Sequence, residues 1–135
     1  MKTSVVRKIT FHSAHRLHNP NWNDTKNKEV FGLCANPNYH GHNYDLLFKV
    51  TGEVNPETGF VMDLKDLSDI LNKEISERFD HRNLNLDVPE FKNLNPTAEN
   101  IAKVVYNIMR PKINTQFDIQ VTLYETPRNF VIYPD

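Results

Sequence analysis

Two long stretches that alternate apolar and polar residues constrain the fold most. In residues 4–15 the apolar positions share one face with His15, and in residues 40–54 they share one face with His40 and His42. Period-two alternation is typical of β-strands with one buried face. If the two strands pair antiparallel, the end of the first lies beside the start of the second. His15 is then predicted to lie next to His40 and His42, on the same face.

The remaining sequence predicts two helices and a second hairpin. Residues 63–79 and 97–109 each carry an apolar stripe at helical spacing, after the potential N-caps Asp63 and Thr97. Residues 117–125 and 130–133 alternate again on either side of a turn. Residues 16–39 show no clear period and are predicted to form a long loop.

The resulting order, β-β-α-α-β-β, predicts one α+β domain over residues 1–135. It should contain a four-stranded antiparallel sheet with both helices on one face. Such a sheet has two edges to protect, which favours closure by oligomerisation.

Composition limits the classes of partner and the compartment. A formal net charge of −1 gives no electrostatic reason to expect a nucleic acid or an anionic membrane as partner. No apolar run reaches the roughly 18–20 residues of a membrane-spanning helix, and residues 1–8 lack the apolar core of a signal peptide. Cys34 is the single cysteine, so no intrachain disulfide can form and a reducing cytoplasm is the expected location.

Three histidines at one end of a hairpin are a candidate metal site. Side chains two apart on a strand lie roughly 6.5–7 Å apart on the same face, so the imidazoles of His40 and His42 can converge on one ion. With His15 they give the three-histidine pattern of catalytic zinc, which leaves a coordination position open. The alternative is that His40 and His42 alternate by chance and His15 is unrelated.

Cys34 lies six residues before His40, in a polar setting. Its thiolate could act as a general base or nucleophile, activated by a metal or by a charged histidine. It could also be a fourth metal ligand, or an inert buried thiol.

Two further carboxylate positions carry possible chemistry. Asp80 could orient His81 as a proton shuttle, although adjacent residues on a helix do not face each other. A polar helix end is the simpler explanation of the pair. Glu125 extends the apolar face of its strand, where a guanidine-like ligand edge such as that of a pterin could bind it. A salt bridge to Arg128 is the simpler alternative for Glu125, and dipole compensation is the simpler role for Glu99.

Seven motifs, taken together, resemble the 6-pyruvoyltetrahydropterin synthase family, which includes the 6-carboxytetrahydropterin synthases of queuosine biosynthesis. In sequence order, with the number of the first residue, they are FHSAHRL (11), CANPNYHGHNY (34), TGEV (51), GFVMDL (59), FDHRNLN (79), PTAEN (96) and YET (124). They span nearly the whole chain in the family's order.

The resemblance implies a role for each candidate residue. His15, His40 and His42 look like the family's zinc ligands, and Cys34 looks like its catalytic base. Asp80 and His81 look like its proton relay. Glu125 looks like its pterin anchor, with Thr97 and Glu99 beside the ring.

The resemblance also implies an assembly and a reaction. The fold is the tunnelling fold, in which two trimers stack into a homohexamer with active sites between subunits. The substrate is 7,8-dihydroneopterin triphosphate, from which a zinc-dependent lyase eliminates triphosphate.

The branch of the family follows from local details. The five residues between Cys34 and His40, and Asn43-Tyr44 after the histidines, look like the pyruvoyl-forming branch. The competing hypotheses are a 6-carboxytetrahydropterin synthase and a pterin- or purine-binding module with structural zinc and no turnover. His12 departs from the small residue usual at its position, and the change of the cysteine to glutamate found in some relatives is absent.

Overall fold

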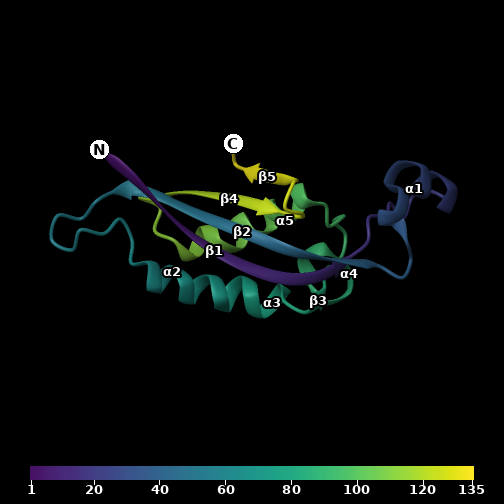
Figure 1. The fold of residues 1–135 in the computed structure, drawn as a ribbon, viewed down its shortest axis with the longest axis horizontal. Helices are drawn as coiled ribbons and strands as arrows, with labels where there is room; N and C mark the ends of the chain where they lie inside the picture. The colour runs from purple at the N-terminus through teal and green to yellow at the C-terminus, as the bar shows by residue number, and fades with distance from the viewer.

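One sheet, built around a long hairpin, organises the molecule (Figure 1). The computed structural model describes residues 1–135. Strands β1 (Lys2–His15) and β2 (His40–Glu53) pair antiparallel along their whole length, from Lys2 opposite Glu53 to His15 opposite His40. The register expected from the alternation is therefore confirmed.

The sheet has five strands in the order β3-β1-β2-β4-β5, not the four predicted. The second hairpin, β4 (Asp118–Tyr124) and β5 (Phe130–Tyr133), is present as expected. The additional strand β3 (Arg82–Asn83) pairs parallel with β1 at Ser13 and Ala14. Two residues are too few to show a period, so this strand could not be predicted from alternation.

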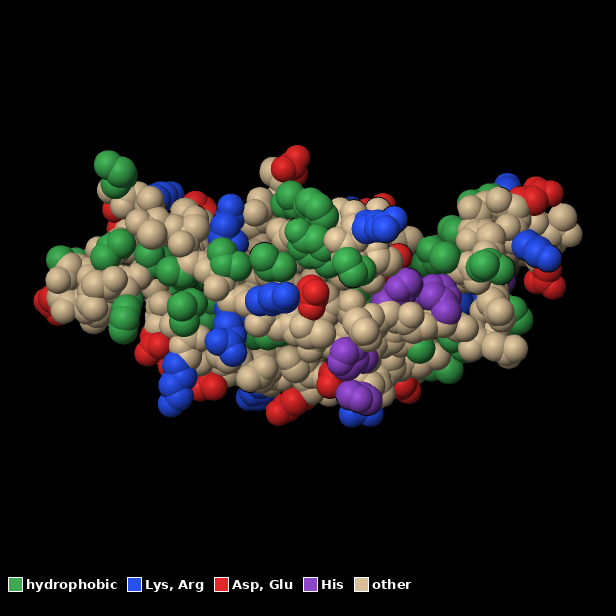
Figure 2. All heavy atoms as spheres, in the orientation of Figure 1, with side chains coloured by type: hydrophobic (Ala, Val, Ile, Leu, Met, Phe, Trp, Pro, Cys, Tyr) green, Lys and Arg blue, Asp and Glu red, His purple; other side chains and the backbone are tan.

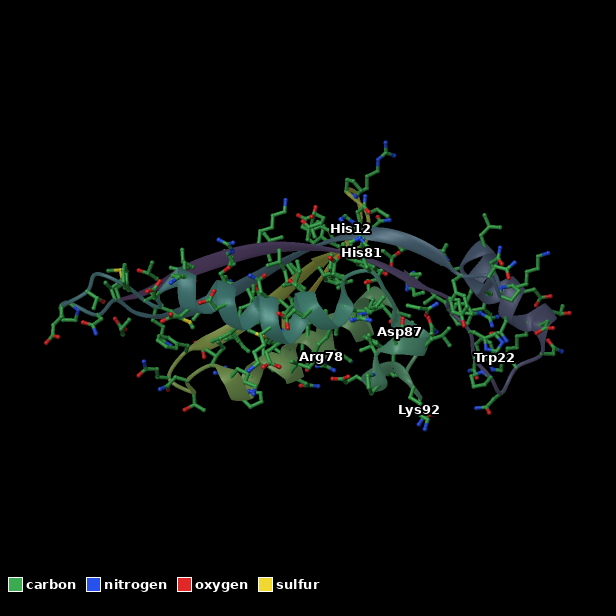
Figure 3. All side chains as sticks on the ribbon, turned by 90° about the horizontal axis from the view of Figure 1, so that it is seen from below. His12, Trp22, Arg78, His81, Asp87 and Lys92 are labelled. Carbon is green, nitrogen blue, oxygen red and sulfur yellow. The ribbon has the colours of Figure 1, made fainter.

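The two predicted helices lie on one side of the sheet, as Figure 3 shows. The first begins at its N-cap Asp63 and comprises α2 (Leu64–Leu71), the π-helical turn η2 (Asn72–Ser76) and α3 (Glu77–Phe79). The second, α5 (Ala98–Met109), is capped by Thr97, whose side chain accepts a hydrogen bond from the backbone N–H of Asn100. Both N-cap predictions are confirmed.

The predicted loop of residues 16–39 is wrong in part, because it contains α1 (Asp24–Phe31) and the 3₁₀ turn η1 (Gly32–Ala35). Asn23 caps α1 by accepting from the N–H of Lys26. The helix stands away from the sheet at one end of the molecule (Figure 1), so it has no long apolar stripe for periodicity to detect. Three short turns complete the chain: α4 (Leu84–Asp87), η3 (Pro89–Phe91) and η4 (Arg110–Lys112).

The core lies between the sheet and the helices and contains 23 buried residues. Phe11, Tyr44 and Phe79 are fully buried at its histidine-bearing end, where Phe11 stacks on Tyr44 with ring centroids 5.0 Å apart. This packing holds the ends of β1 and β2 rigid, as a site built on them requires. No helix is both long and apolar enough to span a membrane.

Candidate active site

Strand pairing brings His15, His40 and His42 together on the core face of the sheet. One ring nitrogen from each lies within 4.8 Å of the other two. The ring centroids are 4.6 Å apart for His15 and His40 and 5.0 Å apart for His15 and His42. The predicted juxtaposition of the three histidines is therefore present.

Four ring nitrogens of this group lack a hydrogen-bond partner within the chain. Nε2 of His15, Nε2 of His42 and both ring nitrogens of His40 are buried and form no hydrogen bond. A buried polar atom without a partner costs about 1–3 kcal/mol. Coordination of one cation would satisfy the three imidazoles together, so the site fits a metal of the zinc class.

Neighbouring groups set the tautomer and charge of the His15 ring for metal coordination. Its Nδ1 lies 2.8 Å from the carbonyl oxygen of Pro96 and therefore donates to it, which leaves Nε2 as the ligand atom. Burial lowers the pKa of His15 to about 4, and burial also lowers the pKa of His40, with His42 as a second cause. Both rings are thus neutral at pH 7, the form that binds metal.

Tyr44 and Pro96 were not singled out from the sequence. The hydroxyl of Tyr44 lies 3.3 Å from Nδ1 of His15, and burial raises the pKa of that hydroxyl. Tyr44 could have been found, because the alternation of β2 places it two residues after His42 on the same face. Pro96 acts through its backbone carbonyl, for which the sequence carries no signal.

Glu125 continues the core face of β4 and approaches the histidines. Its Oε1 lies 3.8 Å from Nε2 of His42, and it forms no ion pair with Arg128. Glu125 also lines a cavity of about 310 Å³ with Thr97 and Glu99. The three residues expected to bind a pterin therefore share one cavity.

Cys34 lies in η1, the turn that precedes β2. The N–H of Leu17 donates to its carbonyl oxygen at 2.7 Å, and Arg16 donates to the carbonyl of Ala35 at 2.9 Å. These bonds hold η1 against the end of β1. The thiol does not belong to the group of potential ligands formed by the histidines.

The electrostatics of Cys34 differ from the expectation of an activated thiolate. In the metal-free chain burial raises the pKa of the thiol, and the negative charge of Glu125 raises it further. A cation held by the histidines would act in the opposite direction.

Asp80 and His81 form the pair that the sequence left doubtful. The chain leaves α3 at Asp80, and His81 has a φ of +58°, which is uncommon for a residue with a side chain. This turn brings Oδ2 of Asp80 to 3.0 Å from Nδ1 of His81. Irregular backbone at the helix end thus allows the adjacent side chains to meet.

The pair does not join the other candidate residues within one chain. It lies against His12 and Asn43, whose side chains alternate to the sheet face opposite the three histidines. Figure 2 shows histidines in two separate groups near this end of the sheet. One chain therefore presents a candidate metal-binding group and a carboxylate–histidine pair on different faces.

The chain is similar to known proteins over nearly its whole length. The sequence profile described as "6-pyruvoyl tetrahydropterin synthase" matches residues 4–135. The human 6-pyruvoyl tetrahydrobiopterin synthase is 39% identical over 132 residues, covering 98% of this chain and 91% of its own. A 6-carboxy-5,6,7,8-tetrahydropterin synthase from Rickettsia conorii is 32% identical over 144 residues, covering 93% of this chain and 96% of its own.

A solved structure shows the same fold at similar identity. The 6-pyruvoyl tetrahydropterin synthase of Caenorhabditis elegans superposes with a TM-score of 0.92 at 38% identity, covering 98% of this chain and 95% of that one. With a family profile that matches nearly every residue, this likeness extends over the whole sheet and its helices. The chain belongs to the 6-pyruvoyl tetrahydropterin synthase family of lyases.

Proposed function

We propose that this chain is a zinc-dependent lyase that converts 7,8-dihydroneopterin triphosphate to 6-pyruvoyltetrahydropterin with loss of triphosphate. The observation that carries the proposal is the group of three histidines, four of whose ring nitrogens are buried without a hydrogen-bond partner, beside a cavity lined by Glu125, Thr97 and Glu99. The relatives named as pyruvoyl-forming enzymes include the human protein at 39% identity.

The histidines would hold zinc through Nε2 of His15 and one ring nitrogen each of His40 and His42. When bound, the metal would polarise oxygen atoms of the substrate side chain and thereby acidify the adjacent C–H bonds. The bond from His15 to the carbonyl of Pro96 keeps that ring in the correct tautomer and orientation.

Residues of the chain would bind the pterin and move protons. The carboxylate of Glu125 would accept two hydrogen bonds from the guanidine-like edge of the pterin. Thr97 and Glu99 line the same cavity and would contact the ring. The thiolate of Cys34 would remove a proton from the substrate side chain, and His81, oriented by Asp80, would deliver one.

The separation of the two groups supports an assembly with shared sites. Because Asp80 and His81 lie on the sheet face opposite the three histidines, a second chain is needed to complete the machinery. We therefore propose a homohexamer with active sites between subunits. The single free cysteine agrees with a cytoplasmic enzyme.

Product analysis tests the reaction. The zinc-loaded protein is incubated with 7,8-dihydroneopterin triphosphate, and the products are identified by mass. Pyruvoyltetrahydropterin and triphosphate are expected. Release of acetaldehyde would instead assign the chain to the carboxy-forming reaction, which the Rickettsia conorii relative makes the nearest competitor.

Two variants test the assigned roles. Cys34→Ala should abolish turnover while zinc and pterin still bind, because the thiol is a base and not a ligand. His40→Ala should lose zinc, and His18→Ala, a histidine outside the metal group, should retain it. If Cys34→Ala still turns over substrate, the thiol is not the catalytic base. If His40→Ala still binds zinc, the three histidines are not the zinc site.

A further inference from the structure

His12, which the proposed mechanism does not use, lies directly beside His81 on the sheet face away from the helices (Figure 3). The two ring centroids are 5.8 Å apart, and the rings meet edge to face at 82°. Both residues line a cavity of about 400 Å³ with Gly41, Asn43 and Arg82. The pair is therefore packed together and also open to a ligand.

The backbone of His12 anchors the turn that carries Asp80 and His81. Its N–H donates to Oδ1 of Asp80 at 2.8 Å, and its carbonyl oxygen accepts from the N–H of His81 at 2.7 Å. The bond to Oδ1 is the main reason that the pKa of Asp80 is lowered. These contacts do not depend on the side chain, so a substitution of His12 leaves them in place.

The side chain of His12 is itself held in one orientation. Its Nδ1 lies 2.7 Å from Oδ1 of Asn43, the residue opposite it on β2. Since Oδ1 can only accept, Nδ1 carries the proton, and the ring is fixed by a bond across the hairpin. By contrast, the His81 side chain is 79% exposed, and its ring contacts are to Asp80 and His12.

We propose that His12 and Asn43 are positioning residues for the Asp80–His81 pair. Asn43 fixes the ring of His12, and that ring limits the rotation of the His81 ring. Nδ1 of His81 then stays paired with the carboxylate of Asp80, and Nε2 of His81 remains free to exchange a proton with the substrate. This inference rests on the proposed function, in which His81 moves a proton.

Steady-state kinetics with the zinc-loaded assembly test it. His12→Ala should lower kcat roughly tenfold with little change in KM, because a loosely held proton donor affects the chemical step more than binding. His12→Phe retains the ring contact and should recover kcat to within about twofold of the native value. Asn43→Ala should fall between the two. Thr10→Ala removes the neighbouring outer-face bond to Asp45, 2.7 Å long, and should leave kcat unchanged.

A double-mutant cycle distinguishes action through His81 from a general structural effect. His81→Ala should lower kcat strongly, and adding His12→Ala should lower it no further. Additive losses, or a His12→Phe variant as slow as His12→Ala, would overturn the positioning role. If His81→Ala turns over normally, it is the proposed function of His81 that fails.

A measurement without turnover tests the orientation separately. Long-range ¹H–¹⁵N NMR of histidine-labelled protein should show His12 as the Nδ1–H tautomer, and Asn43→Ala should convert it to a mixture. An Nε2–H tautomer in the native protein would contradict the bond to Asn43 and overturn the proposal.

Discussion

At the scale of single residues, the site consists of side chains whose charge is set by burial. His15 is fully buried, and its pKa of about 4 lies below the ordinary value of 6.5. The neutral imidazole needs no counter-charge, and its remaining nitrogen is available to a cation. Burial of this histidine thus both prepares a ligand and makes the metal-free fold sensitive to acid.

The metal-free protein should therefore lose stability as the pH falls. Because the pKa of His15 is lower in the folded than in the unfolded chain, its contribution is complete above pH 6.5 and is lost between pH 6.5 and about 4. The loss attributable to His15 should reach roughly 3 kcal/mol. Urea unfolding with chelator present measures it, with His15→Asn as the variant that cannot titrate. An equal pH slope in both proteins would contradict this account.

The residues that sequence reasoning placed correctly are those on long regular strands. Alternation predicts the sheet face of His15, His40, His42 and Glu125, because successive residues on a strand point to opposite faces of the sheet. Asp80 and His81 depend on a positive φ at the end of a helix, which no periodic pattern encodes. Their position on the opposite sheet face could therefore not be predicted.

At the scale of elements, the helix formed by α2, η2 and α3 shows how the spacing of its buried apolar residues accompanies a π-helical turn. Its buried residues Leu67, Leu71, Ile75 and Phe79 recur every four positions. An α-helix has 3.6 residues per turn, so a strict four-residue spacing would rotate the stripe away from the sheet. The π-helical turn at Asn72–Ser76 has more residues per turn and keeps all four side chains in the core. The sequence predicted the helix but not this turn, because apolar spacing alone tolerates either geometry over a few residues.

The N-cap of the same helix provides a test of local stability. Oδ1 of Asp63 accepts from the N–H of Lys65 at 2.9 Å, so Asp63→Ala should lower the free energy of unfolding by about 1 kcal/mol. Asp63→Asn keeps a hydrogen-bond acceptor and should lower the free energy of unfolding much less. Asp66→Ala, in the same first turn but outside the cap, is the control for charge near the helix dipole. Urea titrations at one protein concentration measure all three; equal losses for Asp63→Ala and Asp66→Ala would show that the cap bond contributes nothing.

At the scale of the whole molecule, a single chain separates groups that the proposed reaction needs together. Its three candidate ligand histidines and Glu125 gather at the core side of the sheet end, and Asp80–His81 lies with His12 on the outer face. The strand ends that make the first group rigid also prevent the second from reaching it. Asp80 and His81 cannot move to the first group without breaking their hydrogen bonds to His12 and the pairing of β3 with β1.

Mixed assemblies test whether two chains share each site. Cys34→Ala and His81→Ala should each be inactive alone. When they are mixed at equal amounts, refolded together and loaded with zinc, a site formed by Cys34 of one chain and His81 of another is intact in about one quarter of random pairings. Roughly a quarter of native turnover should then return. A mixture of Cys34→Ala and His40→Ala is the control, because it cannot restore activity if Cys34 and His40 of each site come from the same chain. No recovery in the first mixture would mean that each chain supplies both residues to its own site.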